Sequence, residues 1–98
     1  MERKKLHLVL TYRWYDEWLN GDKDEEYRNI TARYIKMFDK VDLVTEDWDL
    51  VLHRGYTSTT QTYPIEELYM GYGKTEWGAP ANKTVFVIKC KKPLTLEH

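Results

Sequence analysis

The densest group of residues able to do chemistry follows Asn20-Gly21, where charged side chains of both signs lie close together up to Arg28. Lys23 and Arg28 can neutralise a phosphate or donate to base carbonyls, and arginine adds a rigid fork that lysine lacks. Glu26 can accept a hydrogen bond from an exocyclic amine or hold Arg28 in place, because in an extended segment these two side chains share a face. The alternative is a solvated surface strand whose ion pairs contribute little stability. The residue types alone leave both interpretations open.

Two further places offer groups suited to a nucleotide. Trp77 lies in a loop, residues 71–80, that contains three glycines and a proline, and its ring can stack on a base for about 1–3 kcal/mol. It can equally plug one end of the fold. Arg54 and Tyr56 flank Gly55 at the end of an expected strand and can contact a phosphate and a base respectively, or form an ordinary strand-end pair.

The elements that must position these residues follow from hydrophobic periodicity. Apolar residues at helical spacing predict a helix over 11–20 that stops at Gly21, and a second over 30–41 that Asn29 or Thr31 caps. Alternating and β-branched residues predict strands at 6–11, 47–54 and 84–89, and a long or bulged strand over 57–63 and 65–70. Residues 23–28 are almost wholly charged, so they form either a loop or a short strand. This order favours a mixed, mostly antiparallel sheet or small barrel with two helices.

Length and composition limit the chain to one small globular domain. It has 98 residues, of which 14% are aromatic and 42% hydrophobic, a composition that excludes a disordered chain. We expect a single domain over residues 1–95, and residues 96–98, Leu-Glu-His, read like the remnant of a purification tag. The net charge of −1 lacks the global basicity of a DNA-coating protein. Any site for an anion must therefore be a local patch.

The single cysteine and the short apolar runs bear on location and metal content. Cys90 cannot form an internal disulfide or a multi-cysteine zinc site, and we interpret it as a packed small hydrophobe. The longest apolar run near the start, Leu8-Val9-Leu10, is too short for a signal peptide or a membrane span. We therefore expect a cytoplasmic protein with no membrane association, no metal and no cofactor.

The spacing Gly21-x-Lys23-x-x-Glu26-x-Arg28 matches the G-x-K-x-x-E-x-R signature of the ASCH domain, a β-barrel relative of the PUA domain. Four later segments also resemble small single-domain ASCH proteins of bacteria and phages: His53 to Tyr56, Ile65 to Gly73, Trp77 to Pro80, and Val85 to Lys89. The likeness spans nearly the whole chain. It implies an α+β fold, a small PUA-like β-barrel with two α-helices near the N-terminus.

The resemblance further implies a cleft that binds RNA or a nucleotide-like small molecule. Carried onto this sequence, the expected site comprises Gly21, Lys23, Glu26, Arg28, Arg54, Tyr56 and Trp77. Some small ASCH proteins resemble amidohydrolases that act on acylated nucleosides through the motif lysine and a nearby hydroxyl. Here Glu26 stands where those enzymes carry the hydroxyl, which would have to come from Thr57, Thr59 or Thr60.

A third hypothesis, a protein-interaction module, applies if the aromatic residues form an exposed patch. The sequence leaves enzymatic activity and oligomeric state open, and a monomer is the simplest expectation.

Overall fold

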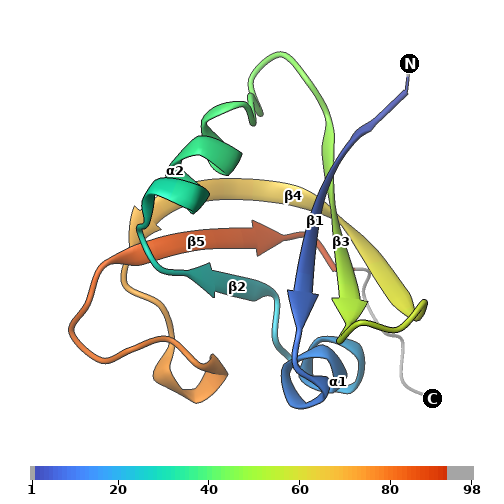
Figure 1. Cartoon of the computed structure of the whole chain (residues 1–98), viewed down its shortest axis with the longest axis vertical. Helices are drawn as coiled ribbons and strands as arrows, with labels where there is room; N and C mark the ends of the chain where they lie inside the picture. The colour runs from blue at the N-terminus through green and yellow to red at the C-terminus, as the bar shows by residue number, and fades with distance from the viewer. Residues whose placement is uncertain (1, 93–98) are drawn as a thin grey trace.

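A computed structural model describes residues 2–92 of the chain, and the expected tag remnant at 96–98 lies outside this range. Two α-helices, one short 3₁₀ helix and five strands follow one another as β1 (Lys4–Leu10), α1 (Tyr12–Asn20), β2 (Glu25–Arg28), α2 (Ala32–Asp39), β3 (Trp48–Arg54), β4 (Thr60–Gly71), η1 (Thr75–Trp77) and β5 (Val85–Cys90). The expected helices and strands are all present. Of the two alternatives for the charged segment 23–28, the structure shows a short strand, β2. Figure 1 shows their arrangement.

Local sequence explains where both helices begin or end. Thr31 caps α2 by accepting a hydrogen bond from the Tyr34 amide, as one of the two predicted caps. Gly21 ends α1, and its amide donates to the Glu17 carbonyl at 3.0 Å. A Cβ atom at position 21 would lie only 2.9 Å from that carbonyl oxygen, so the close approach requires glycine.

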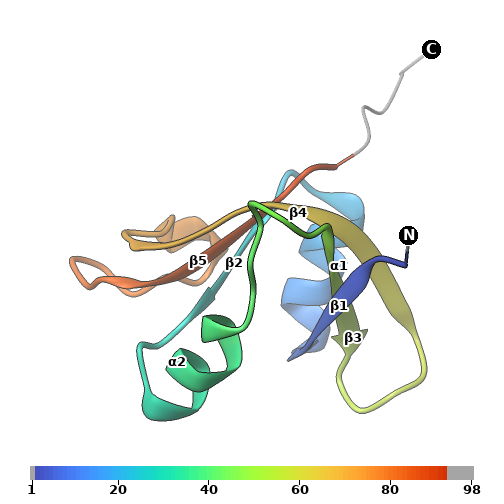
Figure 2. The same ribbon diagram turned by 90° about the horizontal axis from the view of Figure 1, so that it is seen from above.

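The strands form one mixed sheet in the order β1-β3-β4-β5-β2. β1 runs parallel to β3, and the other neighbouring pairs are antiparallel. The first part of β4 pairs with β3 and the second part with β5, with an irregularity in register between Ile65 and Glu67. β4 therefore belongs to both halves of the sheet, as the predicted long or bulged strand requires, and it bends between them (Figures 1 and 2).

The expected closed barrel is wrong, because the two edge strands do not pair with each other. β1 and β2 stand at opposite ends of the strand order, whereas closure would need a backbone ladder between them at a spacing of about 5 Å. The Arg28 side chain crosses the gap instead and donates to the Val9 carbonyl at 3.1 Å. The helices are also interleaved with β1 and β2 rather than gathered at the N-terminus. The fold is a small α+β domain with an open, curled sheet.

The core fills the concave side of this sheet. Leu6, Leu8 and Leu10 of β1 point inward together with alternate residues of β3 and β5. Trp18 of α1 stacks on Tyr63 with ring centroids 5.3 Å apart, and Phe38 of α2 meets Phe86 edge-on at 4.9 Å.

Cys90 is buried in the same core, as expected of a packed small hydrophobe, and burial raises the pKa of its thiol. In the part of the chain that the structure describes, no helix is long and apolar enough to span a bilayer.

Candidate functional site

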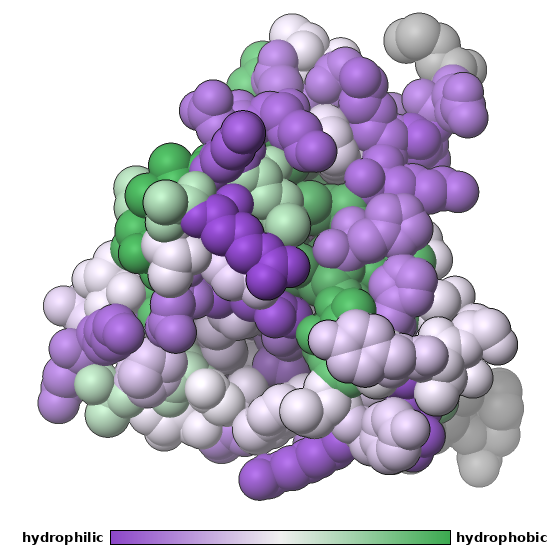
Figure 3. Space-filling model, in the orientation of Figure 1, coloured by the Kyte–Doolittle hydropathy of each residue, from purple (hydrophilic) through white to green (hydrophobic). Residues whose placement is uncertain are grey.

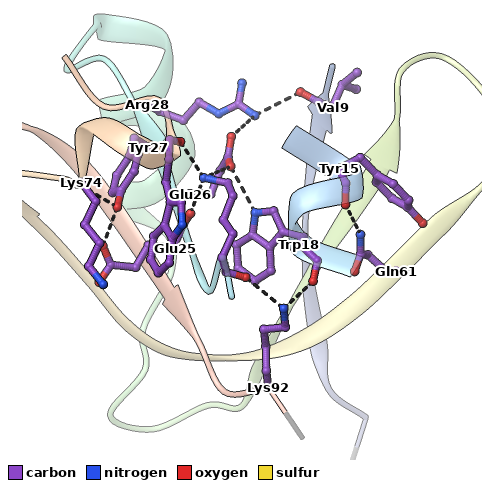
Figure 4. Close-up of polar contacts among 12 residues, drawn as sticks. Val9, Tyr15, Trp18, Glu25, Glu26, Tyr27, Arg28, Gln61, Lys74 and Lys92 are labelled. Carbon is purple, nitrogen blue, oxygen red and sulfur yellow. Dashed lines mark hydrogen bonds and ion pairs between the residues drawn. The ribbon is translucent and has the colours of Figure 1, made fainter. Parts of the chain in front are cut away.

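Lys23 is the most deeply buried charged residue of the predicted site, with only 1% of its surface exposed. Its Nζ atom donates to the Glu25 carbonyl at 2.7 Å and to the Trp77 carbonyl at 2.9 Å. The same atom lies 3.4 Å from Glu26 Oε1. The ammonium group of Lys23 is thus enclosed and does not face solvent. Figure 4 shows the adjoining contacts of Glu26 with Trp18 and Arg28.

Aromatic rings complete the surroundings of Lys23. Its Nζ atom lies 5.2 Å from the ring centroid of Trp14, 5.0 Å from that of Tyr27 and 5.9 Å from that of Trp77. Electron-rich ring faces attract a cation, but here they also displace the water that would hydrate the ammonium group. Burial accordingly lowers the pKa of Lys23, while the negative charge of Glu26 acts in the opposite direction.

The loop that carries Trp77 is held against β2 by Tyr27. The Tyr27 hydroxyl donates to Glu25 at 2.7 Å and accepts from the Lys74 amide at 2.9 Å. A Cβ atom at Gly73 would lie 2.4 Å from the Tyr27 ring, so only glycine lets the loop come this close. Trp77 therefore contributes a carbonyl and a ring to the enclosure of Lys23, and its side chain is only partly buried.

Glu26 connects Lys23 to Arg28. Its Oε1 atom accepts from Trp18 Nε1 at 3.3 Å and faces Lys23, while its Oε2 atom accepts from Arg28 Nη2 at 3.2 Å. Both carboxylate oxygens are thus engaged, and only 10% of the Glu26 side chain is exposed. The contact with Arg28 fits one of the two roles that the sequence left open for Glu26, which is to hold Arg28 in place.

Arg28 is the charged motif residue that reaches a hollow. Its Nη2 atom donates to Glu26 and to the Val9 carbonyl, and Nη1 donates to the Tyr34 hydroxyl at 3.3 Å. These bonds use three of the five guanidinium donors, and the buried Nε atom has no partner within the described residues. Two cations and one carboxylate, Lys23, Arg28 and Glu26, leave the cluster with one net positive charge.

Two hollows meet at Arg28 and Tyr34. The first, of about 420 Å³, lies between β1 and α2, and its lining includes His7, Arg33 and Tyr56. The second, of about 520 Å³, lies between β2 and the loop before β5, and its lining includes Lys83. Among the described residues that line the two hollows, none is an Asp or a Glu. Figure 3 shows the face with the first hollow, where hydrophilic side chains border apolar surface.

The other predicted residues are divided between this site and a separate one. Tyr56 lines the first hollow and is 98% exposed. Arg54 lines neither hollow, because its guanidinium makes two hydrogen bonds with Asp16, at 3.1 and 3.2 Å, which lower the pKa of that carboxyl. Gly21 lies beside Asp16 in a further hollow of about 410 Å³. The expected role of Gly21 and Arg54 in one shared cleft therefore has no support in the geometry.

Several residues that line the two hollows lie outside the motif, and the sequence did not identify them as site residues. Arg33 and Lys83 are isolated basic residues in the sequence, and Tyr34 was expected only on the apolar face of its helix. His7 forms a 2.9 Å hydrogen bond with His53 on the neighbouring strand. Burial, followed by the charge of His53, lowers the pKa of His7. No group of three or more metal-ligating side chains occurs within residues 2–92.

The arrangement also bears on the hydrolase hypothesis. Within the described residues, the oxygen partners of Lys23 Nζ are two main-chain carbonyls and one carboxylate, with no threonine hydroxyl among them. The Thr57 hydroxyl bonds instead to the Arg54 carbonyl at 2.6 Å, in the turn between β3 and β4. Among the described residues, Lys23 is thus not paired with a hydroxyl that could serve as the nucleophile.

Comparisons of the chain with models of protein families, with curated proteins and with solved structures found no match.

Proposed function

We propose that this domain binds RNA or a nucleotide-like ligand in the cleft formed by the two hollows on either side of Arg28. The observation that carries the proposal is the charge of the lining. Arg28, Arg33 and Lys83 contribute positive charge, and no carboxylate lines either hollow among the described residues. In a protein of net charge −1, such a concentration of one sign favours an anionic ligand.

The motif residues support this role at different distances from the ligand. Arg28 lines both hollows, and its guanidinium keeps one Nη1 donor that no described residue uses, which suits a phosphate or a base carbonyl. Glu26 fixes the orientation of that guanidinium, and Lys23 fixes Glu26. Lys23 is therefore a positioning residue in this proposal, which differs from the direct phosphate contact that its type suggests.

The first hollow also suits a base. Tyr56 is almost fully exposed at its rim, and Leu8, Leu10 and Met37 contribute apolar lining. Stacking on an exposed ring is worth about 1–3 kcal/mol per base. The small number of cations predicts few phosphate contacts and therefore a weak dependence of affinity on salt.

The test is a fluorescence-anisotropy titration of a labelled single-stranded RNA of mixed sequence, at two salt concentrations, with unlabelled mononucleotides as competitors. Arg33→Glu should weaken binding at least about tenfold and reduce the salt slope by about one. The matched control is Lys36→Glu, which makes the same charge change on the same helix at a residue outside both hollows. Tyr56→Ala should weaken binding by about five- to 100-fold, whereas Tyr72→Ala, at another exposed tyrosine, should not.

Two results would contradict the proposal. One is the absence of saturable binding at strand concentrations of about 1 mM, which is weaker than ordinary non-specific binding. The other is an equal effect of Arg33→Glu and Lys36→Glu, because binding would then depend on net charge and not on this cleft.

A further inference from the structure

A further concave surface lies between α2, the segment that follows it, and β4. It is a groove of about 580 Å³, and ten of its twelve lining residues are apolar or aromatic. Phe38 and Phe86 are buried in it. The other apolar lining residues are Ile30, Ile35, Val41, Leu43, Val44, Leu68, Tyr69 and Met70.

The exposure of this lining is high for side chains of its type. Val44 is 93% exposed, Met70 is 62% exposed and Ile35 is 50% exposed. Each large apolar side chain that leaves water stabilises the state that buries it, and contiguous apolar surface on a small protein marks a place of contact. Part of this surface is visible in Figure 3 beside α2, near the end of β4.

The charged lining residues of the groove are both carboxylates, Asp39 and Asp42. Asp39 is the last residue of α2 and Asp42 lies three residues beyond it, near the negative end of the helix dipole. Asp42 accepts hydrogen bonds from the amides of Val44 and Thr45, and the Thr45 hydroxyl and these amides lower its pKa. One end of the groove therefore carries fixed negative charge, and Lys36 and Lys40 of the same region do not line it.

We propose that this groove binds a short amphipathic segment of a partner protein, whose apolar side chains fill it and whose Lys or Arg side chains pair with Asp39 and Asp42. An amphipathic helix lying in an apolar groove is a common mode of peptide recognition. A second copy of this chain fits less well, because a two-fold contact would bring the same pair of carboxylates from both copies into one interface. Nucleic acid would be repelled by this charge, so the groove is distinct in ligand class from the Arg28 cleft.

The probe is a labelled 12-residue helix-forming peptide of Leu, Ala and Lys, amphipathic in pattern, titrated with the whole protein by fluorescence anisotropy. A peptide with every Lys replaced by Glu, and otherwise identical, is its control and should bind at least about tenfold more weakly. Met70→Lys should abolish saturable binding, whereas Tyr72→Lys, a change at an exposed residue outside the groove, should leave it intact. Asp39→Lys should weaken binding about fivefold or more, because it removes an exposed ion pair and adds repulsion, and Asp22→Lys should not.

Circular dichroism of each variant establishes that it folds. If Met70→Lys does not fold, Val44→Lys gives the same test at a nearly fully exposed residue. Equal binding of the Lys and Glu peptides would overturn the proposal. Unchanged binding of the Lys peptide by both Met70→Lys and Val44→Lys would also overturn it. Sedimentation that shows a dimer of the wild type, dissociated by Val44→Lys, would overturn it in favour of a second copy.

Discussion

Replacing Glu26 by Gln should strongly destabilise the fold, because it removes the only negative charge between Lys23 and Arg28 in the cluster while keeping the size of the side chain. The carboxylate lies 3.4 Å from Lys23 Nζ and 3.2 Å from Arg28 Nη2. Each separation corresponds to about 5 kcal/mol of attraction at an effective dielectric constant of about 20. Lys23 can relieve its unpaired charge by releasing a proton, which for an ordinary pKa of 10.5 costs at most about 5 kcal/mol at pH 7.

The expected loss is therefore about 3–5 kcal/mol, the range for a broken buried pair, out of a total stability of about 5–15 kcal/mol for a domain. Urea unfolding at pH 7 measures it, with tryptophan fluorescence as the signal because Trp18 donates directly to Glu26. The matched control is Glu67→Gln, at an exposed residue of β4, which should change stability by no more than about 0.5 kcal/mol.

The double variant Lys23→Met with Glu26→Gln tests the electrostatic cause. It removes one of the two stranded cations, and Arg28, with 18% of its side chain exposed, can retain some hydration. We expect it to recover about half or more of the stability that Glu26→Gln loses. A loss below about 1 kcal/mol for Glu26→Gln would refute this reasoning, because the motif would then behave as the solvated surface strand that the sequence also allowed.

Two further predictions concern pH and backbone geometry. Burial and the charge of His53 hold the pKa of His7 below its ordinary value of 6.5. The unfolded chain therefore binds more protons at this residue, and the fold loses stability as the pH falls below 6.5. In urea unfolding between pH 7.5 and 5, His7→Gln should reduce this loss, and an unchanged pH dependence would contradict the assignment. Gly78→Ala should destabilise the fold by about 1–3 kcal/mol, because Gly78 has φ of +98° and a Cβ atom there would lie 2.9 Å from the Trp14 ring. Thermal unfolding measures this change, and an unchanged midpoint would show that the loop relaxes without cost.

Local patterns were enough to predict most elements but not the closure of the sheet. The apolar spacing of α1 and α2, the stop at Gly21 and the cap at Thr31 are all encoded within a few residues. β2 is different, because its strand state depends on pairing with β5, in which Arg28 lies opposite Phe86. Whether β1 and β2 meet depends on how far β4 bends, and no local pattern specifies that angle.

The motif groups Lys23, Glu26 and Arg28, and their side chains contact one another in the structure. Their burial, however, could not be predicted from the sequence. Whether Lys23 faces solvent depends on rings from α1 and η1, which come together only in the folded chain. Arg54 likewise donates hydrogen bonds to Asp16, which lies 38 residues earlier. No residue near Arg54 in the sequence indicates that partner.

The position of β5 inside the sheet has a consequence for the order in which the chain can fold as it is synthesised. β5 lies between β4 and β2 in the strand order, although β2 is made more than half the chain earlier. β2 and its ionic cluster therefore have no strand partner until residues 85–90 have left the ribosome. Because such non-local pairing is slow to form, Glu26 and Arg28 of the nascent chain must stay hydrated until this last step. The charged side chains of residues 22–28 keep the segment compatible with water before β5 is made.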